Sequence, residues 1–80
     1  MYIVYILKSV ITHHFYVGQT DDLDKRILRH NSGKVKWTSR YVPWKIVFKQ
    51  NFDTREEALV REKYFKSHAG RNWLKKNVGQ

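Results

Sequence analysis

The 80-residue sequence has no cysteine and contains one proline and four glycines. The absence of cysteine excludes disulfide bonds, thiolate zinc sites and cysteine nucleophiles. No apolar run approaches the roughly 18 residues that a helix needs to cross a bilayer. The N-terminal apolar run begins at residue 1, without the charged leader or cleavage-like small residues of a signal peptide. We therefore expect a cytoplasmic protein with no membrane partner.

Acidic residues are also scarce. Seven Asp and Glu stand against sixteen Lys and Arg, which gives a formal net charge of +9. Solubility alone seldom requires more than about 2 to 8 charges on a small domain. The excess predicts a polyanionic partner, with nucleic acid as the first candidate. An anionic membrane surface is the second candidate, disfavoured because no segment has the pattern of a basic amphipathic helix with a broad apolar face.

Apolar and aromatic residues are plentiful, at 41% and 15% of the chain. This content is too high for a disordered chain. Residues 1–80 are enough for one domain, near the lower limit for a self-sufficient core. Three Trp, five Tyr and four Phe are a heavy aromatic load for this length, so we expect some of them to serve a surface.

Three segments have the pattern of strands. Residues 2–8 (YIVYILK) are apolar on both alternating faces, which is typical of a central strand covered on both sides. Residues 9–13 form a polar turn, and residues 15–18 return as the second strand of a hairpin. The third strand is expected over residues 45–52.

The first helix follows N-cap candidates at residues 20–22 and is expected to run to about Asn31, where the Ser-Gly pair at 32–33 would end it. On a helical wheel, two basic side chains lie directly beside the apolar stripe. These are Arg26 and His30, and both should lean over the sheet.

The second helix is expected to open with a capping box, because Thr54 precedes Glu57 by three residues. It would continue to about His68 and end at Gly70, and residues 71–77 favour a further short basic helix. The predicted order is ββαβα(α): an α+β fold with a small three-stranded antiparallel sheet flanked by helices.

Glu62 lies in the middle of an apolar face of this second helix. The expected members of that face are Ala58, Leu59, Phe65 and Ala69. An unpaired buried carboxylate costs several kcal/mol, so Glu62 should have a cationic partner. One alternative is an internal salt bridge to a residue such as Arg26. The other is Mg²⁺, which favours one or two carboxylates plus waters and substrate phosphate.

Five other residues that could belong to a functional site also have ordinary structural explanations when each is considered alone. Tyr5 and Tyr16 could be core aromatics with their hydroxyls at an edge, and Gly18 could be a bulge or turn residue. Arg26 could be a solvated helix residue. His30 could be a cation favoured by the dipole at a helix end.

The spacing of these same residues resembles that of the GIY-YIG nuclease domain. Tyr16 follows Tyr5 by eleven residues and begins the triplet Tyr-Val-Gly. Arg26 follows Gly18 by eight residues, and His30 lies one helical turn further on, ahead of a distal helical glutamate.

The resemblance is closest to the small stand-alone members and covers nearly the whole chain. The matching segments are YIVYIL, YVG, LDKRILRHNSG, Thr38, Pro43-Trp44 and EALVREKYFK. The chain departs from the family pattern at Ile3, where the first motif has glycine, although the tyrosine of that motif is present. The chain departs again at the family's late asparagine, which has no clear counterpart; Asn72 and Asn77 are candidates for it.

The resemblance implies hydrolysis of DNA phosphodiesters with one divalent metal, Mg²⁺, for which Mn²⁺ could substitute. By similarity, Glu62 would hold the metal and Tyr16 would activate the attacking water. Tyr5 would act as a relay or an alternative base. Arg26 would brace the phosphate through its planar guanidinium, and His30 would share the proton transfer or contact phosphate.

A basic loop over residues 33–43 carries Trp37, Arg40 and Tyr41 and fits a surface that follows a nucleic-acid backbone with stacking aromatics. The alternative, that the aromatics close a small core, is equally open for Trp37 and favoured for Trp44. The residues expected to contact nucleic acid are Lys34, Lys36, Trp37, Arg40, Lys66 and Arg71, with further phosphate contacts from Lys75 and Lys76.

The sequence thus predicts a Mg²⁺-dependent endonuclease acting on DNA, with branched, nicked or flapped structures among its candidate substrates. A partner protein or a homodimer could supply specificity. The alternative is a non-catalytic nucleic-acid-binding module that uses the same basic surface.

Overall fold

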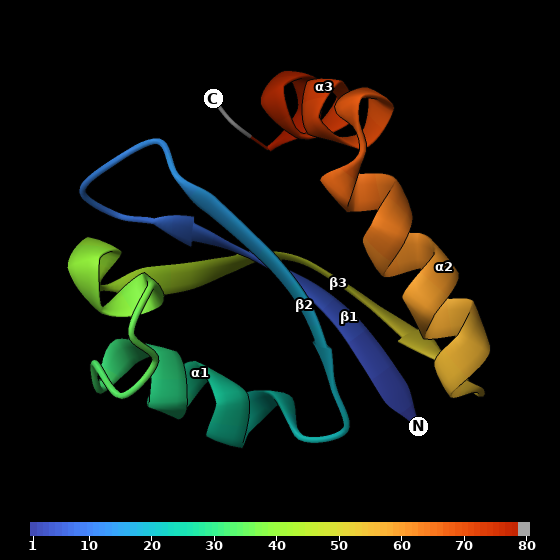
Figure 1. Cartoon of the computed structure of the whole chain (residues 1–80), viewed down its shortest axis with the longest axis horizontal. Helices are drawn as coiled ribbons and strands as arrows, with labels where there is room; N and C mark the ends of the chain where they lie inside the picture. The colour runs from blue at the N-terminus through green and yellow to red at the C-terminus, as the bar shows by residue number, and fades with distance from the viewer. Residues whose placement is uncertain (79–80) are drawn as a thin grey trace.

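The computed structural model describes residues 1–78. Three strands and three α-helices follow the predicted order, with one additional 3₁₀ turn, η1 (Figure 1). The elements are β1 (Tyr2–Ser9), β2 (Phe15–Thr20), α1 (Leu23–Asn31), η1 (Thr38–Tyr41), β3 (Trp44–Phe52), α2 (Arg55–Lys66) and α3 (His68–Asn77). The α+β prediction is confirmed. The element that the sequence did not indicate is η1, which lies in the basic loop.

The sheet is antiparallel, with strand order β2-β1-β3. The two-sided apolar pattern of β1 therefore identified the central strand correctly. In the β1–β2 register, Tyr5 lies opposite Gly18 and Leu7 lies opposite Tyr16. Because side chains alternate along a strand, Tyr5 and Tyr16 project from the same face of the sheet.

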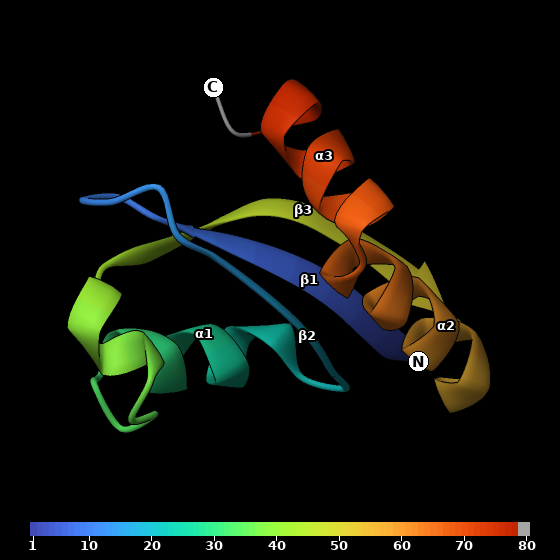
Figure 2. The same ribbon diagram turned by 45° about the horizontal axis from the view of Figure 1, so that its top comes forward.

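Helices cover both faces of the sheet, α1 on one side and α2 with α3 on the other (Figure 2). On the α1 face, Tyr5 and Leu7 pack with Leu23 and Trp44. On the α2 face, the buried cluster consists of Val4, Ile6, Ala58, Phe65 and Leu74. The strand β2 is an edge strand, so a residue of α2 and a residue on the α1 face can meet beside it.

The predicted helix caps are present. Asp22 caps α1 by accepting a hydrogen bond from the backbone N–H of Lys25 at 3.2 Å, and Thr54 caps α2 by accepting from that of Glu57 at 3.2 Å. Gly33 follows α1 with φ of +79°, a left-handed conformation that glycine adopts without strain.

The predicted end of α2 is wrong. The helix ends at Lys66, and Ser67 caps the next helix by accepting from the backbone N–H of Gly70 at 3.2 Å. Gly70 lies inside α3 rather than at a helix end. A Cβ at this position would lie 2.0 Å from the carbonyl oxygen of Tyr64, so the glycine permits the close approach of α2 and α3.

The expected apolar face of α2 is correct only in part. Ala58 and Phe65 are buried, whereas Leu59 is exposed and Ala69 lies exposed on α3. The short turn between the helices changes the chain direction after Ser67, so a wheel drawn through both helices placed Ala69 on the wrong face.

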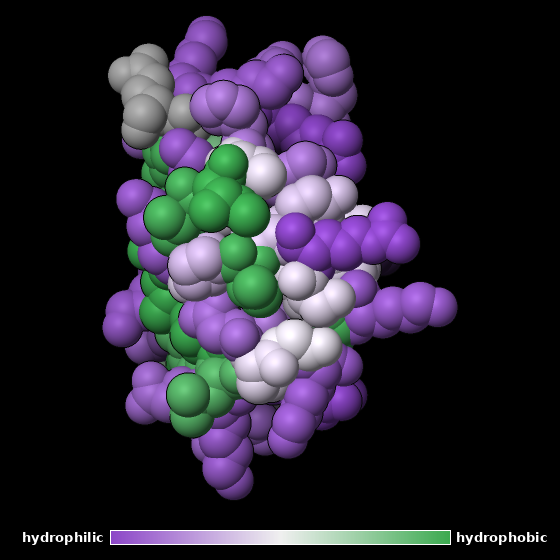
Figure 3. Space-filling view, turned by 90° about the vertical axis from the view of Figure 1, so that its left-hand side faces the viewer, coloured by the Kyte–Doolittle hydropathy of each residue, from purple (hydrophilic) through white to green (hydrophobic). Residues whose placement is uncertain are grey.

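Exposed apolar side chains gather at the end of the molecule that carries the β1–β2 connection (Figure 3). Val10 and Ile11 in this connection are 58% and 65% exposed and belong to neither core cluster. Within residues 1–78, no helix has the length and apolar character required to cross a membrane.

Candidate active site

The two tyrosines form the floor of the site on the α1 face. Their ring centroids are 6.2 Å apart. A Cβ on Gly18 would lie 2.7 Å from the hydroxyl oxygen of Tyr5 and 3.1 Å from Cε2 of Tyr16. Gly18 is therefore not a bulge residue, because the register shift of the sheet lies between Ile6 and Leu7 in the β1–β3 pair. Its missing side chain allows the two phenols to approach the strand.

The substitution Gly18→Ala is expected to lower the free energy of unfolding by about 1 to 3 kcal/mol and to displace the Tyr5 ring, since the new methyl group overlaps it. Urea denaturation and the NMR signals of the Tyr5 ring measure both effects. Gly33→Ala is the matched control, because its Cβ meets only Ser39 at 3.9 Å and its cost is limited to the positive φ. A Gly18→Ala protein with an unmoved Tyr5 ring would contradict this role.

A chain of hydrogen bonds fixes His30. The hydroxyl of Tyr5 lies 3.2 Å from Nε2 of His30, and Nδ1 lies 3.0 Å from Oγ1 of Thr38. Thr38 donates its own hydroxyl proton to the carbonyl of Val35 at 3.3 Å. Thr38 must then accept from Nδ1–H, which leaves Nε2 as the acceptor for the Tyr5 hydroxyl. All three side chains are buried, so this tautomer is protected from solvent.

Burial sets the protonation of these groups. It lowers the pKa of His30, and the neighbouring Arg26 and Arg29 lower it further, so the imidazole is neutral at pH 7. Burial raises the pKa of Tyr5 well above its usual range, with Tyr16 and Glu62 adding to the rise and Arg26 opposing it. Tyr5 therefore keeps its proton. His30 is a buried neutral base rather than a solvated cation at a helix end.

The lowered pKa of His30 predicts how stability depends on pH. Because an unfolded histidine has a pKa near 6.5, the unfolded chain binds this proton before the folded chain does. The free energy of unfolding should therefore fall as the pH drops below about 6.5, and His30 should contribute no pH dependence above it.

Urea denaturation at pH 5 and pH 7.5 measures this dependence. His30→Gln should remove most of the difference between the two pH values, whereas the control His13→Gln, at an exposed turn position, should keep it. Equal stability of the wild-type protein at both pH values would overturn the assignment.

Arg26 lies where the helical wheel predicted, half-buried on α1, while Lys25 and Arg29 are exposed. It lines a small pocket of about 290 Å³ together with Gln19 of β2 and Arg55 of α2. Its charge acts on both Tyr5 and His30. Arg26 thus lies within electrostatic reach of Tyr5 and His30 and lines the same pocket as Gln19 at the edge of β2.

Glu62 approaches the same edge from the α2 face. Its side chain is 16% exposed and forms an ion pair with Lys66, with Nζ and Oε2 2.7 Å apart. Gln19 of β2 donates from Nε2 to the other carboxylate oxygen at 3.2 Å. The expected cationic partner is present, but it is Lys66 rather than Arg26. The i, i+4 spacing of Glu62 and Lys66 is the sequence signal for this pair.

A divalent metal fits the polar atoms at this edge. Within residues 1–78 there is no cluster of three or more His, Asp or Glu, so a metal here would have few protein ligands. Mg²⁺ is commonly bound this way, through one or two carboxylates, waters and substrate phosphates. Oε1 of Gln19 is buried and has no hydrogen-bond partner among the described residues. A carboxylate beside an orphaned amide oxygen suits a cation that prefers oxygen ligands. The sequence did not single out Gln19.

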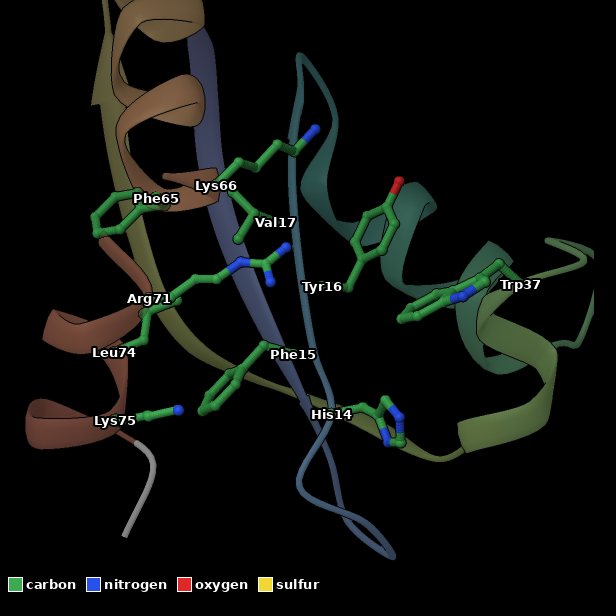
Figure 4. Close-up of a pocket in the computed structure, with 10 residues that line it drawn as sticks. All are labelled: His14, Phe15, Tyr16, Val17, Trp37, Phe65, Lys66, Arg71, Leu74 and Lys75. Atoms are coloured by element: carbon green, nitrogen blue, oxygen red, sulfur yellow. The ribbon is translucent and has the colours of Figure 1, made fainter. Parts of the chain in front are cut away.

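A groove of about 550 Å³ runs along β2 and collects part of the predicted nucleic-acid surface (Figure 4). Trp37, Lys66 and Arg71 line it, together with His14 and Lys75. Three further residues predicted to contact nucleic acid do not line it and are exposed on the basic loop: Lys34, Lys36 and Arg40.

The two tryptophans that bracket η1 differ in their exposure to solvent. Trp44 is buried and donates from Nε1 to the carbonyl of Thr38 at 2.9 Å, so it supports the residue that fixes His30. Trp37 is 48% exposed. The core alternative thus holds for Trp44, and Trp37 presents much of its ring to solvent.

Comparison with known proteins gives consistent matches. The model of the GIY-YIG catalytic domain matches residues 1–77. A UPF0213 protein of Staphylococcus saprophyticus is 37% identical over 73 residues, which cover 90% of this chain and 88% of the relative. The UPF0213 protein YazA of Bacillus subtilis is 43% identical over 53 residues, which span 65% of this chain and 54% of YazA. The solution NMR structure of a UPF0213 protein from Bacillus halodurans has a TM-score of 0.57 at 35% identity, covering 99% of this chain and 87% of that one.

Proposed function

The chain belongs to the GIY-YIG catalytic domain family, a nuclease family, and we propose that it is a Mg²⁺-dependent endonuclease that hydrolyses phosphodiester bonds in DNA. One observation carries the proposal: Tyr16 of edge strand β2 packs with Tyr5 and His30, and Gln19 of that same strand donates a hydrogen bond to Glu62. Polar groups from both faces of the sheet are thereby available to one phosphodiester.

Glu62 and Gln19 are the residues that would hold Mg²⁺. When bound, the metal would polarise the phosphate and stabilise the departing 3′ oxygen. Arg26 would brace a non-bridging phosphate oxygen, for which its planar guanidinium is better suited than an ammonium group. Because Lys66 forms an ion pair with Glu62, a metal bound to Glu62 would displace the ammonium group of Lys66. The displaced lysine would then be free to contact phosphate.

We assign activation of the attacking water to Tyr16, whose hydroxyl forms no hydrogen bond within the described residues. Tyr5 is a relay rather than a base, because its raised pKa keeps it protonated and it already donates to His30. The water gives a proton to the Tyr16 oxygen, the Tyr16 hydroxyl proton passes to the Tyr5 oxygen, and the Tyr5 proton passes to Nε2 of His30. The water oxygen then forms the new bond to phosphorus, and the bond from phosphorus to the 3′ oxygen breaks.

A nicking assay tests the proposal. Supercoiled plasmid and a panel of branched oligonucleotides are incubated with the protein in Mg²⁺ or in EDTA, beside Glu62→Ala. We expect metal-dependent cleavage by the wild-type protein and a loss of at least 100-fold in the variant, with DNA affinity retained. Wild-type protein that binds these DNAs but cuts none in Mg²⁺ or Mn²⁺ would contradict the proposal and favour the binding-module alternative.

Target selection is a separate proposal. The groove and the basic loop offer backbone and stacking contacts but no evident reader of base edges, so sequence or structure preference would come from a partner protein or a second copy of this chain. Equal cleavage of unrelated sequences by the isolated protein would fit this assignment.

A further inference from the structure

The groove beside β2 has two chemically different walls (Figure 4). Lys66, Arg71 and Lys75 of α2 and α3 form the cationic wall. Trp37, Tyr16 and His14 form the aromatic wall. The floor of the groove is apolar and includes Phe15 and Val17, which lie on the side of β2 that faces α2 and α3.

The aromatic wall is a connected series of rings that begins at the proposed catalytic Tyr16. The centroids of Tyr16 and Trp37 are 6.2 Å apart, and those of Trp37 and Tyr41 are 5.3 Å apart. His14 stacks on Tyr41 with centroids 4.0 Å apart. Because Trp37 is 48% exposed, a large part of its ring is available to a ligand.

The cationic wall is open to an anion. Arg71 and Lys75 are four residues apart on α3 and therefore share one side of the helix. Both are exposed, and neither forms an ion pair with residues 1–78. Lys66 shares its charge with Glu62 at the end of the groove that lies towards the proposed metal ligands.

This pairing of walls favours one form of nucleic acid. In a duplex the faces of the bases are stacked inside, so a duplex could use the cations but would leave the aromatic wall and the apolar floor without contacts. An unpaired strand can place its phosphates on the cations and stack its bases on the rings. The two walls and the floor are all used only when the strand is single.

We propose that the groove binds an unpaired stretch of a polynucleotide strand, with phosphates along Arg71 and Lys75 and a base stacked on Trp37, and that it leads the strand to Tyr16. One consequence rests on the proposed nuclease function: the bond that the protein cleaves should lie next to single-stranded DNA. The binding itself does not require cleavage.

Fluorescence anisotropy in EDTA tests the groove without any contribution from catalysis. The probes are a labelled single-stranded DNA, the same strand in a duplex, and the matching RNA strand. We expect single-stranded DNA to bind at least 10-fold more tightly than the duplex. Trp37→Ala should weaken this binding by roughly 10-fold, because one base loses its stacking partner, and Trp37→Phe should retain most of it.

Charge variants separate the groove from the general basic surface. Arg71→Ala should reduce the slope of log affinity against log salt by about 0.7, as expected for one lost phosphate contact on a single strand. Lys49→Ala is the matched control, since Lys49 is exposed on β3, at the opposite edge of the sheet, and it should leave the slope unchanged.

Three results would overturn the inference: equal affinity for the duplex, unchanged affinity in a folded Trp37→Ala protein, or equal effects of Arg71→Ala and Lys49→Ala. A clear preference for the RNA strand would overturn its assignment to DNA. Single-strand binding in the groove without cleavage would contradict the nuclease proposal alone, and cleavage of pure duplex without single-strand binding would contradict this inference alone.

Discussion

Replacing Tyr16 by phenylalanine is expected to lower the rate of Mg²⁺-dependent DNA cleavage by at least 100-fold, the scale of a lost general base. Stability should change little, because the Tyr16 side chain is only partly buried and its hydroxyl forms no hydrogen bond within residues 1–78. Single-turnover cleavage and urea denaturation of the same preparation measure the two quantities.

Tyr5→Phe provides the contrast. Its hydroxyl is buried and donates to His30, so its loss leaves the buried Nε2 without a donor and should cost about 1 to 3 kcal/mol of stability. Cleavage should also fall, because the route to His30 is broken. If Tyr16→Phe cleaved at the wild-type rate while Tyr5→Phe did not, the assignment of the base to Tyr16 would be wrong.

Gly70→Ala is expected to destabilise the protein more than Gly18→Ala does, by about 3 kcal/mol or more. The added Cβ would lie 2.0 Å from the carbonyl oxygen of Tyr64 and 2.6 Å from Cα of Phe65. Both are backbone atoms of α2, so no side-chain rotation can relieve the overlap. The contact can be removed only by separating α2 from α3, which would disturb Leu74 in the core.

Thermal and urea denaturation measure this cost. Asn72→Ala, an exposed position in the same helix, is the control and should change stability by no more than about 0.5 kcal/mol. A Gly70→Ala protein as stable as the control would show that the helices do not meet as closely as the structure indicates.

Local sequence signals predicted most of the fold. The alternation along β1 identified the central strand. The N-cap candidates at residues 20–22 include Asp22, which caps α1, and Thr54 of the predicted capping box caps α2. The corner between α2 and α3 could not be predicted in this way. Glycine is common after a helix, so the local sequence predicts that Gly70 ends α2. Its actual role depends on how closely a later helix approaches Tyr64, which is a tertiary property.

The candidate site likewise contains residues that local sequence patterns predicted and residues whose role depends on tertiary contacts. The hairpin pattern placed Tyr5 and Tyr16 on neighbouring strands, and the helical wheel placed Arg26 and His30 beside the sheet. Thr38 stood out only through the family resemblance, because the loop that carries it has no periodic pattern from which η1 could be inferred. Gln19 was missed because its contact with Glu62 depends on how α2 crosses the edge strand.

The proposed role of Glu62, to hold a divalent metal at the edge of β2 within reach of the tyrosine group, can be tested without DNA. The measurement is titration of ¹⁵N-labelled protein with Mn²⁺, because paramagnetic broadening falls off steeply with distance from the metal. We expect the side-chain amide of Gln19 and the backbone amide of Glu62 to broaden first, EDTA to reverse the effect, and Glu62→Gln to abolish it. Broadening centred on the exposed acids at the start of α1 or α2, with Gln19 unaffected, would overturn this metal site.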